Sequence, residues 1–194
     1  MTKTFLKTIL IAGTFAGLTA ATASAQMALP DNMSLSSSSK IWFDGTSNVK
    51  SFSCSAKKID LDVVSNAGVS ATNPVKSASL SIPVALLDCK NGTMNGHMRD
   101  ALKADKNPAI TWKLASYRVE GTAVVLAGTL TIAGRENPIE LHGTGVADNG
   151  TISFKGTKVL RMTEYGVKPP SLMFGTMKVA DPITVSFDLV LNQQ

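Results

Sequence analysis

The sequence predicts an all-β protein: an eight-stranded antiparallel barrel with one short helix between strands. The clearest evidence lies in residues 122–141, where apolar residues such as Leu130 alternate with hydroxylated residues such as Thr131. This period of two is typical of a strand with one buried face. The closing segment, 183–191, alternates in the same way along its whole length. A two-sheet sandwich would show the same periodicity, so it stays open as the alternative fold.

The other strands follow from the same alternation between turn-forming segments. Polar turn residues separate them at 44–47 and 65–74, and Asp148-Asn149-Gly150 is a strong hairpin signal. Strands are predicted, in chain order, at 40–43, 48–64, 75–85, 109–120, across the hairpin 122–141 and its continuation to 146, and at 151–160 and 183–191.

Three of these strands contain breaks in their pattern. In 48–64 the apolar phase changes midway, which predicts a β-bulge near residues 55–57. Pro83 indicates a sheet edge or a further bulge, because proline cannot donate a ladder hydrogen bond. In the central hairpin, residues 134–138 (GRENP) are predicted to form the turn.

Residues 91–106 are the one helical candidate. Thr93 is expected to cap the helix, and Asn107-Pro108 would end it. Apolar residues fall on one helical stripe: Met94, Met98, Ala101 and Leu102. Because this helix lies between strands, we expect it to lie across one mouth of the barrel.

Residues 1–25 are predicted to be a cleaved signal peptide. Two lysines precede a short apolar run, and Ala23-Ser24-Ala25 fits an A-x-A cleavage site. The run is short for a bilayer and is interrupted by glycine and threonine, which disfavours the alternative of a membrane anchor. We expect residues 26–37 to be a flexible segment, residues 38–194 to form one domain, and the protein to be periplasmic or secreted.

The two cysteines, Cys54 and Cys89, both follow the predicted signal peptide. An even number of cysteines in an oxidising compartment favours a disulfide bond between them. Two separate buried thiols are the alternative. A metal site is disfavoured, because two thiolates without nearby ligands make a poor zinc site.

Composition and motifs argue against several classes of function. The net charge is +5, and it is a mild +3 without Lys3 and Lys7 of the predicted signal peptide; no basic cluster alternates with aromatic residues, so nucleic-acid binding is not expected. The chain has two histidines, no G-x-S-x-G and no H-E-x-x-H motif, so we predict no enzymatic activity, no catalytic residue and no cofactor. Asp60 and Asp62 could lie on the same face of one strand. A glycosidase needs two carboxylates on opposite sides of a sugar, whereas two neighbours on an exposed face are ordinarily solvated surface residues.

Two places in the chain carry residues that could bind a ligand. Met94, His97 and Met98 could bind copper with thioether and imidazole ligands, but packing of the helix on the barrel is the favoured interpretation, and no metal site is predicted. Arg161 could contact a ligand head group at the barrel mouth. The alternative is an ion pair with Glu164 or a backbone contact that holds the following loop.

The chain also resembles a known family, the YceI-like proteins. The likeness extends over about residues 38–191 and rests on short motifs in the family's order, each weak alone. These motifs are His97-Met98, Pro108-Ala-Ile-Thr-Trp112, Gly128-Thr-Leu-Thr-Ile-Ala-Gly134, Asn137-Pro138-Ile-Glu-Leu141, Arg161, and Tyr165-Gly166-Val167. The chain departs from the family at Leu86–Cys89 and Met94–Met98, so it resembles a divergent member.

The resemblance implies a lipocalin-like barrel around an elongated apolar tunnel. It implies that the protein holds a polyisoprenoid-like lipid or another long amphiphile in the periplasm, without catalysis, stable membrane insertion or a nucleic-acid partner. Homodimer formation is left open. The alternative is a dry-cored structural or protein-interaction module, in which the same apolar residues fill the interior. The residues expected to contact the ligand are Phe52, Leu80, Ile82, Met94, Met98, Leu102, Ile110, Trp112, Leu114, Leu126, Leu130, Ile132, Phe154 and Phe187, with Arg161 at a head group.

Overall fold

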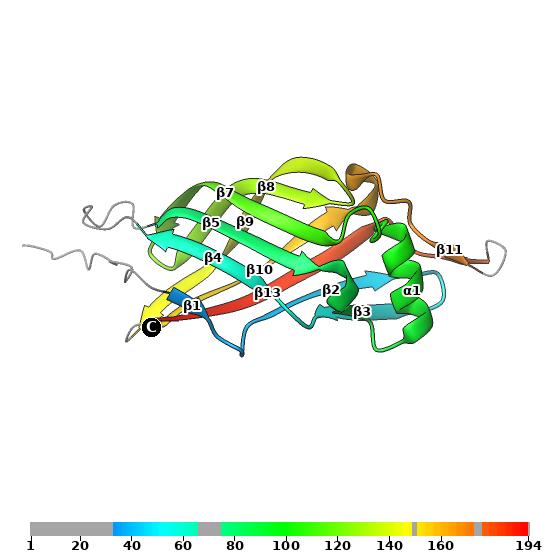
Figure 1. The fold of residues 1–194 in the computed structure, drawn as a ribbon, viewed down its shortest axis with the longest axis horizontal. Coiled ribbons are helices and arrows are strands. Elements are labelled where there is room, and N and C mark those ends of the chain that lie inside the picture. Colours follow the sequence, from blue (N-terminus) through cyan, green and yellow to red (C-terminus); the bar gives the residue numbers. More distant parts are fainter. Residues whose placement is uncertain (1–32, 66–74, 149–150, 173–175, 194) are drawn as a thin grey trace, which may run out of the picture.

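One antiparallel sheet curls around the interior and forms the body of the protein (Figure 1). The computed structural model describes residues 33–65, 75–148, 151–172 and 176–193. The strand order in the sheet is β4-β5-β7-β8-β9-β10-β13-β2-β3-β6, and β1 pairs with β13 beside this path. β1 also contacts β4, the strand at one end of the strand order. It therefore lies between β13 and that end of the curled sheet and partly fills the gap there. The all-β class is confirmed, and the residues that the structure describes contain one short α-helix between strands, as predicted.

The bounds of the elements are as follows. The sheet contains β1 (Met33–Leu35), β2 (Lys40–Thr46), β3 (Ser51–Ala56), β4 (Asp60–Ser65), β5 (Val75–Pro83), β6 (Leu87–Asp88), β7 (Ala109–Glu120), β8 (Ala123–Ile132), β9 (Arg135–Asp148), β10 (Thr151–Arg161) and β13 (Pro182–Gln193). A separate pair consists of β11 (Ser171–Leu172) and β12 (Met177–Lys178). The helices are η1 (Val84–Leu86), α1 (Gly92–Ala101) and η2 (Met162–Tyr165).

The predicted count of eight strands is wrong, because the sheet has eleven. One of the three additional strands comes from the segment 48–64, which is two strands rather than one bulged strand. β3 pairs with β2 and β6, whereas β4 pairs with β5 at the opposite end of the strand order. The chain therefore leaves one edge of the sheet at residues 57–59 and joins the other. The short strands β1 and β6 are the other two additional strands.

The central hairpin has a tighter turn than predicted. Ala133 and Gly134 have positive φ angles of 50° and 79°, so two residues complete the turn and β9 begins at Arg135. Pro138 consequently lies inside a strand, in register with β8. It is tolerated because the β9–β10 ladder covers only residues 143–148 of β9, so proline's missing N–H costs no hydrogen bond on that side.

Two further boundaries differ from the sequence interpretation. β2 continues to Thr46 through the predicted turn at 44–47, because these residues pair with the start of β3. The helix is capped by Asn91 rather than Thr93, since the Asn91 side chain accepts a hydrogen bond from the backbone N–H of Met94 at 3.0 Å. It also ends well before residue 106.

The N-terminal region is described only from Met33 onwards. Residues 33–35, inside the segment predicted to be flexible, form β1, while the predicted signal peptide lies outside the described residues. Within the described ranges, the structure has no helix with both the length and the apolar character needed to cross a membrane.

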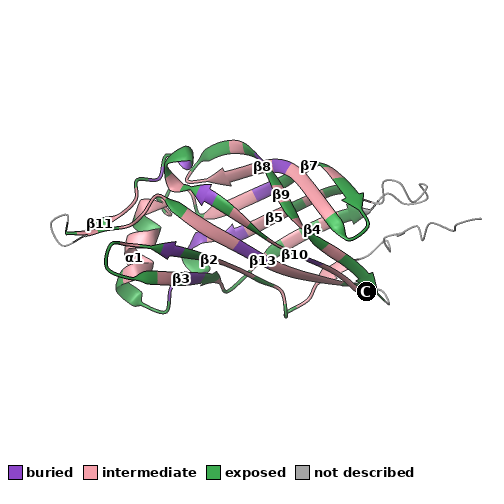
Figure 2. Cartoon of the chain, turned by 180° about the vertical axis from the view of Figure 1, so that it is seen from behind, coloured by how far each residue is buried: buried purple, intermediate pink, exposed green. Residues whose placement is uncertain are grey.

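Alternation along the strands sets what faces inward. Figure 2 shows exposed residues alternating with less exposed ones along the strands. On β13, for example, Ile183, Val185, Phe187, Leu189 and Leu191 face the interior, as their period of two predicts. The same rule orients each long strand, so the curled sheet has a continuous apolar inner face.

Candidate functional site

The interior of the curled sheet contains a cavity of about 630 Å³. At one end it is lined by Met98 of α1 and Met177 of β12, and at the other by Val119, Val146 and Leu191 near the ends of β7, β9 and β13. In Figure 1, α1 lies at one end of the long axis and the C-terminal end of β13 lies at the other. The cavity therefore runs along the barrel rather than forming a local pocket.

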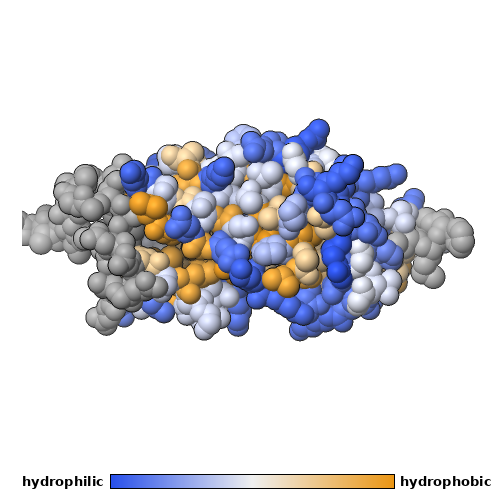
Figure 3. All heavy atoms as spheres, in the orientation of Figure 1, coloured by the Kyte–Doolittle hydropathy of each residue, from blue (hydrophilic) through white to orange (hydrophobic). Residues whose placement is uncertain are grey.

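Every residue expected from the sequence to contact a ligand lines this cavity. The residues are Phe52, Leu80, Ile82, Met94, Met98, Leu102, Ile110, Trp112, Leu114, Leu126, Leu130, Ile132, Phe154 and Phe187, together with Arg161. Figure 3 shows hydrophobic residues also visible from outside over the body of the sheet, while hydrophilic residues dominate around α1.

Inward aromatic rings lie against glycines of neighbouring strands, which keeps them along the wall. A Cβ on Gly156 would lie 2.6 Å from Cζ of Phe187, and one on Gly143 would lie 2.6 Å from Cε2 of Phe154. The two phenylalanine rings stack on each other with centroids 4.9 Å apart. Because glycine leaves room for each ring at the wall, the large side chains leave space in the middle.

One part of the interior is closely packed, next to the place where β9 and β10 separate. Trp112, Ile139, Leu160, Tyr165 and Val167 form a buried cluster there, with the last two inserted by η2 and the residues after it. Burial, and then the negative charge of the neighbouring glutamate, raise the pKa of the Tyr165 hydroxyl above its ordinary value. This cluster fills the gap in the sheet and lies beside the cavity.

Side chains of β9 hold this insertion in place. Asn137 Nδ2 and Arg135 Nη1 both donate hydrogen bonds to the backbone carbonyl of Glu164, at 3.0 Å and 3.4 Å. Gly166 then turns the chain with a φ of 66°. The motif Tyr165-Gly166-Val167 is thus explained by packing.

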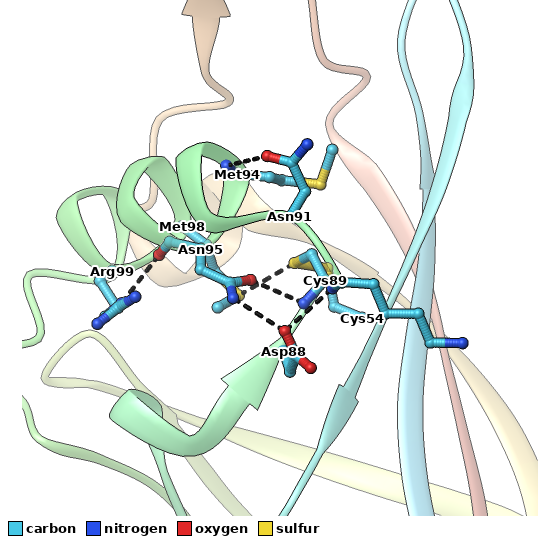
Figure 4. The surroundings of a disulfide bond; sticks show 9 residues. Cys54, Asp88, Cys89, Asn91, Met94, Asn95, Met98 and Arg99 are labelled. Atoms are coloured by element: carbon cyan, nitrogen blue, oxygen red, sulfur yellow. Dashed lines mark hydrogen bonds between the residues drawn. A yellow bond between two sulfur atoms is a disulfide. The ribbon is translucent and has the colours of Figure 1, made fainter.

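A disulfide bond fixes α1 at one end of the cavity (Figure 4). It joins Cys54 of β3, which is 1% exposed, to Cys89, which precedes the helix. The backbone N–H of Cys89 donates to Asn95 Oδ1 at 2.7 Å, and Asn95 Nδ2 donates to Asp88 Oδ1 at 2.9 Å. Met98 Sδ lies 3.8 Å from Cys89 Sγ, which is a packing contact because a disulfide sulfur has no proton.

Asp88 is the charged anchor of this end. Hydrogen bonds from Asn95, the ammonium of Lys57 at 3.1 Å, and the backbone N–H of Lys90 lower the pKa of the Asp88 carboxyl from 3.8 to about 2. A carboxylate at this position thus ties the start of α1 to the loop that follows β3.

Arg161 lies at the edge of the cavity with its side chain 65% exposed. Its ion-pair partner is Asp181, at 3.9 Å, and not Glu164 as the sequence suggested. The backbone N–H and hydroxyl of Thr163 donate to the Asp181 carboxylate and lower its pKa below its ordinary value. Asp181 therefore holds the loop after β10 and partly neutralises Arg161.

Comparison with known proteins identifies the family. Residues 21–191 match the YceI-like domain family. The chain belongs to this family. No match was found among curated proteins.

Several solved structures are similar in fold to this YceI-like domain. BcnA from Burkholderia cenocepacia is 24% identical, with a TM-score of 0.66 and coverage of 78% of this chain and 95% of the other. A Campylobacter jejuni YceI protein is 19% identical, with a TM-score of 0.60 and coverage of 73% and 84%. A polyisoprenoid binding domain from Saccharophagus degradans, implicated in plant cell wall breakdown, is 14% identical, with a TM-score of 0.60 and coverage of 84% and 98%.

Three polar features of this YceI-like domain complete the site. His97 lines the cavity together with Met94 and Met98. Within the described ranges, His, Cys, Asp and Glu side chains form no group of three or more that could hold a metal ion. Lys158 lines the cavity, and the buried indole Nε1 of Trp112 has no hydrogen-bond partner among the described residues. Sequence reasoning missed Lys158, although it shares the parity of the inward residues of β10.

Proposed function

We propose that this YceI-like domain binds a long amphiphile, such as a polyisoprenoid-like lipid, inside its cavity and does no chemistry on it. The observation that carries the proposal is the apolar cavity of about 630 Å³ that runs the length of the barrel. Sites that enclose one small ligand typically measure about 300–1,000 Å³. The fold is shared with a domain described as polyisoprenoid-binding. A hollow interior argues against the alternative of a dry-cored module.

The shape and lining of the cavity suit a flexible apolar chain. Burial of apolar surface contributes about 0.8 kcal/mol per methylene group. Two added methylenes therefore strengthen binding by roughly tenfold in Kd, for as long as the added length stays inside the cavity. The methionines of α1 are adaptable apolar side chains, which suits contact with chains of differing conformation.

Two observations support a carrier role without catalysis. Cys54 and Cys89 are joined in a disulfide, so neither supplies a thiol nucleophile. No Asp or Glu is among the described residues that line the cavity, so His97 has no carboxylate beside it there to form an acid–base pair.

The cellular setting follows from the same features. A disulfide persists in an oxidising compartment, and the predicted signal peptide would deliver the chain to the periplasm or outside the cell. Homodimer formation, and the expected lack of nucleic-acid partners and stable membrane insertion, stay predictions.

A chain-length series tests the proposal. Protein beginning after residue 25 is saturated with the fluorescent probe N-phenyl-1-naphthylamine, which is then displaced by normal alcohols from octanol to octadecanol and by geranylgeraniol. We expect Kd to fall by roughly tenfold for each two carbons and then to level off when the cavity is full. No displacement, or affinity that rises with length without levelling off, as for adsorption on an outer surface, would contradict the proposal.

A further inference from the structure

The charged residues that line the cavity are of one sign. They are Lys50, Lys158 and Arg161, and no Asp or Glu is among the described lining residues. Arg161 is largely exposed and lies near Asp181, and Lys50 is exposed just before β3. Lys158 differs from both, because it is half-buried and lies within β10, three residues before the end of the strand.

The position of Lys158 follows from the alternation of β10. Its neighbours Thr157 and Val159 are exposed, with Val159 at 60%, whereas Lys158 is half-buried and lines the cavity with Phe154 and Leu160. Its side chain therefore starts from the inner face of the sheet.

The strand register shows where along the cavity Lys158 lies. It pairs with Val185 of β13, which pairs with Phe43 of β2, which pairs with Cys54 of β3. All four residues line the cavity. Lys158 thus belongs to the same transverse row as the buried disulfide, about 10 Å along β10 from its end at Arg161.

Lys158 consequently lines the cavity without a partner for its ammonium. No ion pair or hydrogen bond reaches the Lys158 ammonium in the part of the chain that the structure describes. The Nε1 of Trp112 also has no partner among those residues, but it is buried against Gly128 of the wall and does not open onto the cavity. An ammonium beside an apolar wall is unfavourable unless an opposite charge accompanies it. A ligand group beside Lys158 is therefore expected to be anionic.

We propose that the cavity selects amphiphiles that carry a carboxylate or phosphate group, with that group beside Lys158 and the apolar chain along the barrel wall. This inference rests on the proposed function and adds the chemical class of the ligand. A neutral alcohol of the same length fills the same apolar surface but leaves the ammonium without its counter-charge.

Matched probes and variants test the inference. Displacement titrations compare palmitate, hexadecyl phosphate and hexadecanol on the wild-type protein, on Lys158→Met and on Lys113→Met. Lys113 is exposed on β7 and does not line the cavity, so its replacement removes the same charge from the outside. Methionine keeps the length and apolar stem of the lysine.

We expect the wild-type protein to bind at least one anionic probe about tenfold or more tightly than hexadecanol. Lys158→Met should lose this preference without weaker binding of hexadecanol, and Lys113→Met should keep it. Preference for palmitate or for hexadecyl phosphate would distinguish carboxylate from phosphate ligands.

Several outcomes would overturn the inference. Equal binding of charged and neutral probes by the wild-type protein would refute it while the proposed function stands, and this comparison needs no variant to fold. A preference that survives in Lys158→Met would refute the role of this residue. No binding of any probe would refute both the inference and the proposed function.

Discussion

Enlarging a small residue of the cavity wall should stabilise this protein. Ala78 of β5 lines the cavity and packs against the buried cluster around Trp112. In a solid core, Ala78→Phe would overpack the interior and lower the free energy of unfolding by about 1–3 kcal/mol. In a hollow barrel, the added ring enters empty apolar space.

The magnitude follows from the space available. Burying a phenylalanine side chain contributes about 1.5–3 kcal/mol, and a cavity of about 630 Å³ accepts the ring without forcing its neighbours apart. We expect the free energy of unfolding of Ala78→Phe to rise by about 1 kcal/mol, and Tm by about 2–4 °C. Binding of hexadecanol should weaken, because the ring occupies part of its site.

The assay is urea unfolding of ligand-free, oxidised protein, followed by far-UV circular dichroism. Ser79→Phe is the matched control, because Ser79 is the next residue of β5 and is exposed. It adds the same side chain outside the barrel, so its stability should stay within about 0.5 kcal/mol of wild type and its affinity should not change. A loss of 1 kcal/mol or more in Ala78→Phe, beyond any loss in the control, would show that the interior is filled and would refute this reasoning.

Three further predictions concern stability. Replacing Cys54 and Cys89 together by serine should lower the free energy of unfolding by about 3–4 kcal/mol in denaturant titrations, because the bond closes a loop with a sequence separation of 35; an unchanged midpoint would contradict this. The pKa of Asp88 is lowered to about 2 in the folded state, so its stabilising effect is complete above its ordinary pKa of 3.8 and is lost as the pH falls towards 2. Between pH 5 and pH 2, the wild-type protein should lose more of its free energy of unfolding than Asp88→Asn. Equal losses would contradict the stabilising role of the Asp88 carboxylate. Gly156→Ala should lower Tm, because its Cβ would clash with a ring and a backbone carbonyl, whereas Gly96→Ala in α1 has open space and should raise stability by up to about 1 kcal/mol.

The sequence predicted best what depends on local periodicity. Alternation with a period of two decides which face of a strand a side chain occupies, so the lining of the cavity followed once strands were assigned. The same rule would have placed Lys158 inside, since it has the parity of Phe154 and Leu160. It was missed because a charged residue was expected on the outer face.

Features that depend on distant pairing could not be predicted in the same way. The change of apolar phase within 48–64 fits a β-bulge as well as a break between strands, and only the partners at opposite ends of the strand order reveal that β3 and β4 are separate. The two-residue turn at Ala133 and Gly134 depends on positive φ at an alanine, which its residue type disfavours. The insertion of Tyr165 is set by a gap in the sheet that only the register shows.

Native mass spectrometry of the disulfide-bonded protein taken directly from cells tests the central claim most directly. Our account expects the mass of the chain plus one amphiphile, released on denaturation and replaced by added palmitate or hexadecyl phosphate at one molecule per chain. A spectrum that shows the bare chain alone, both from cells and after incubation with these lipids, would contradict it.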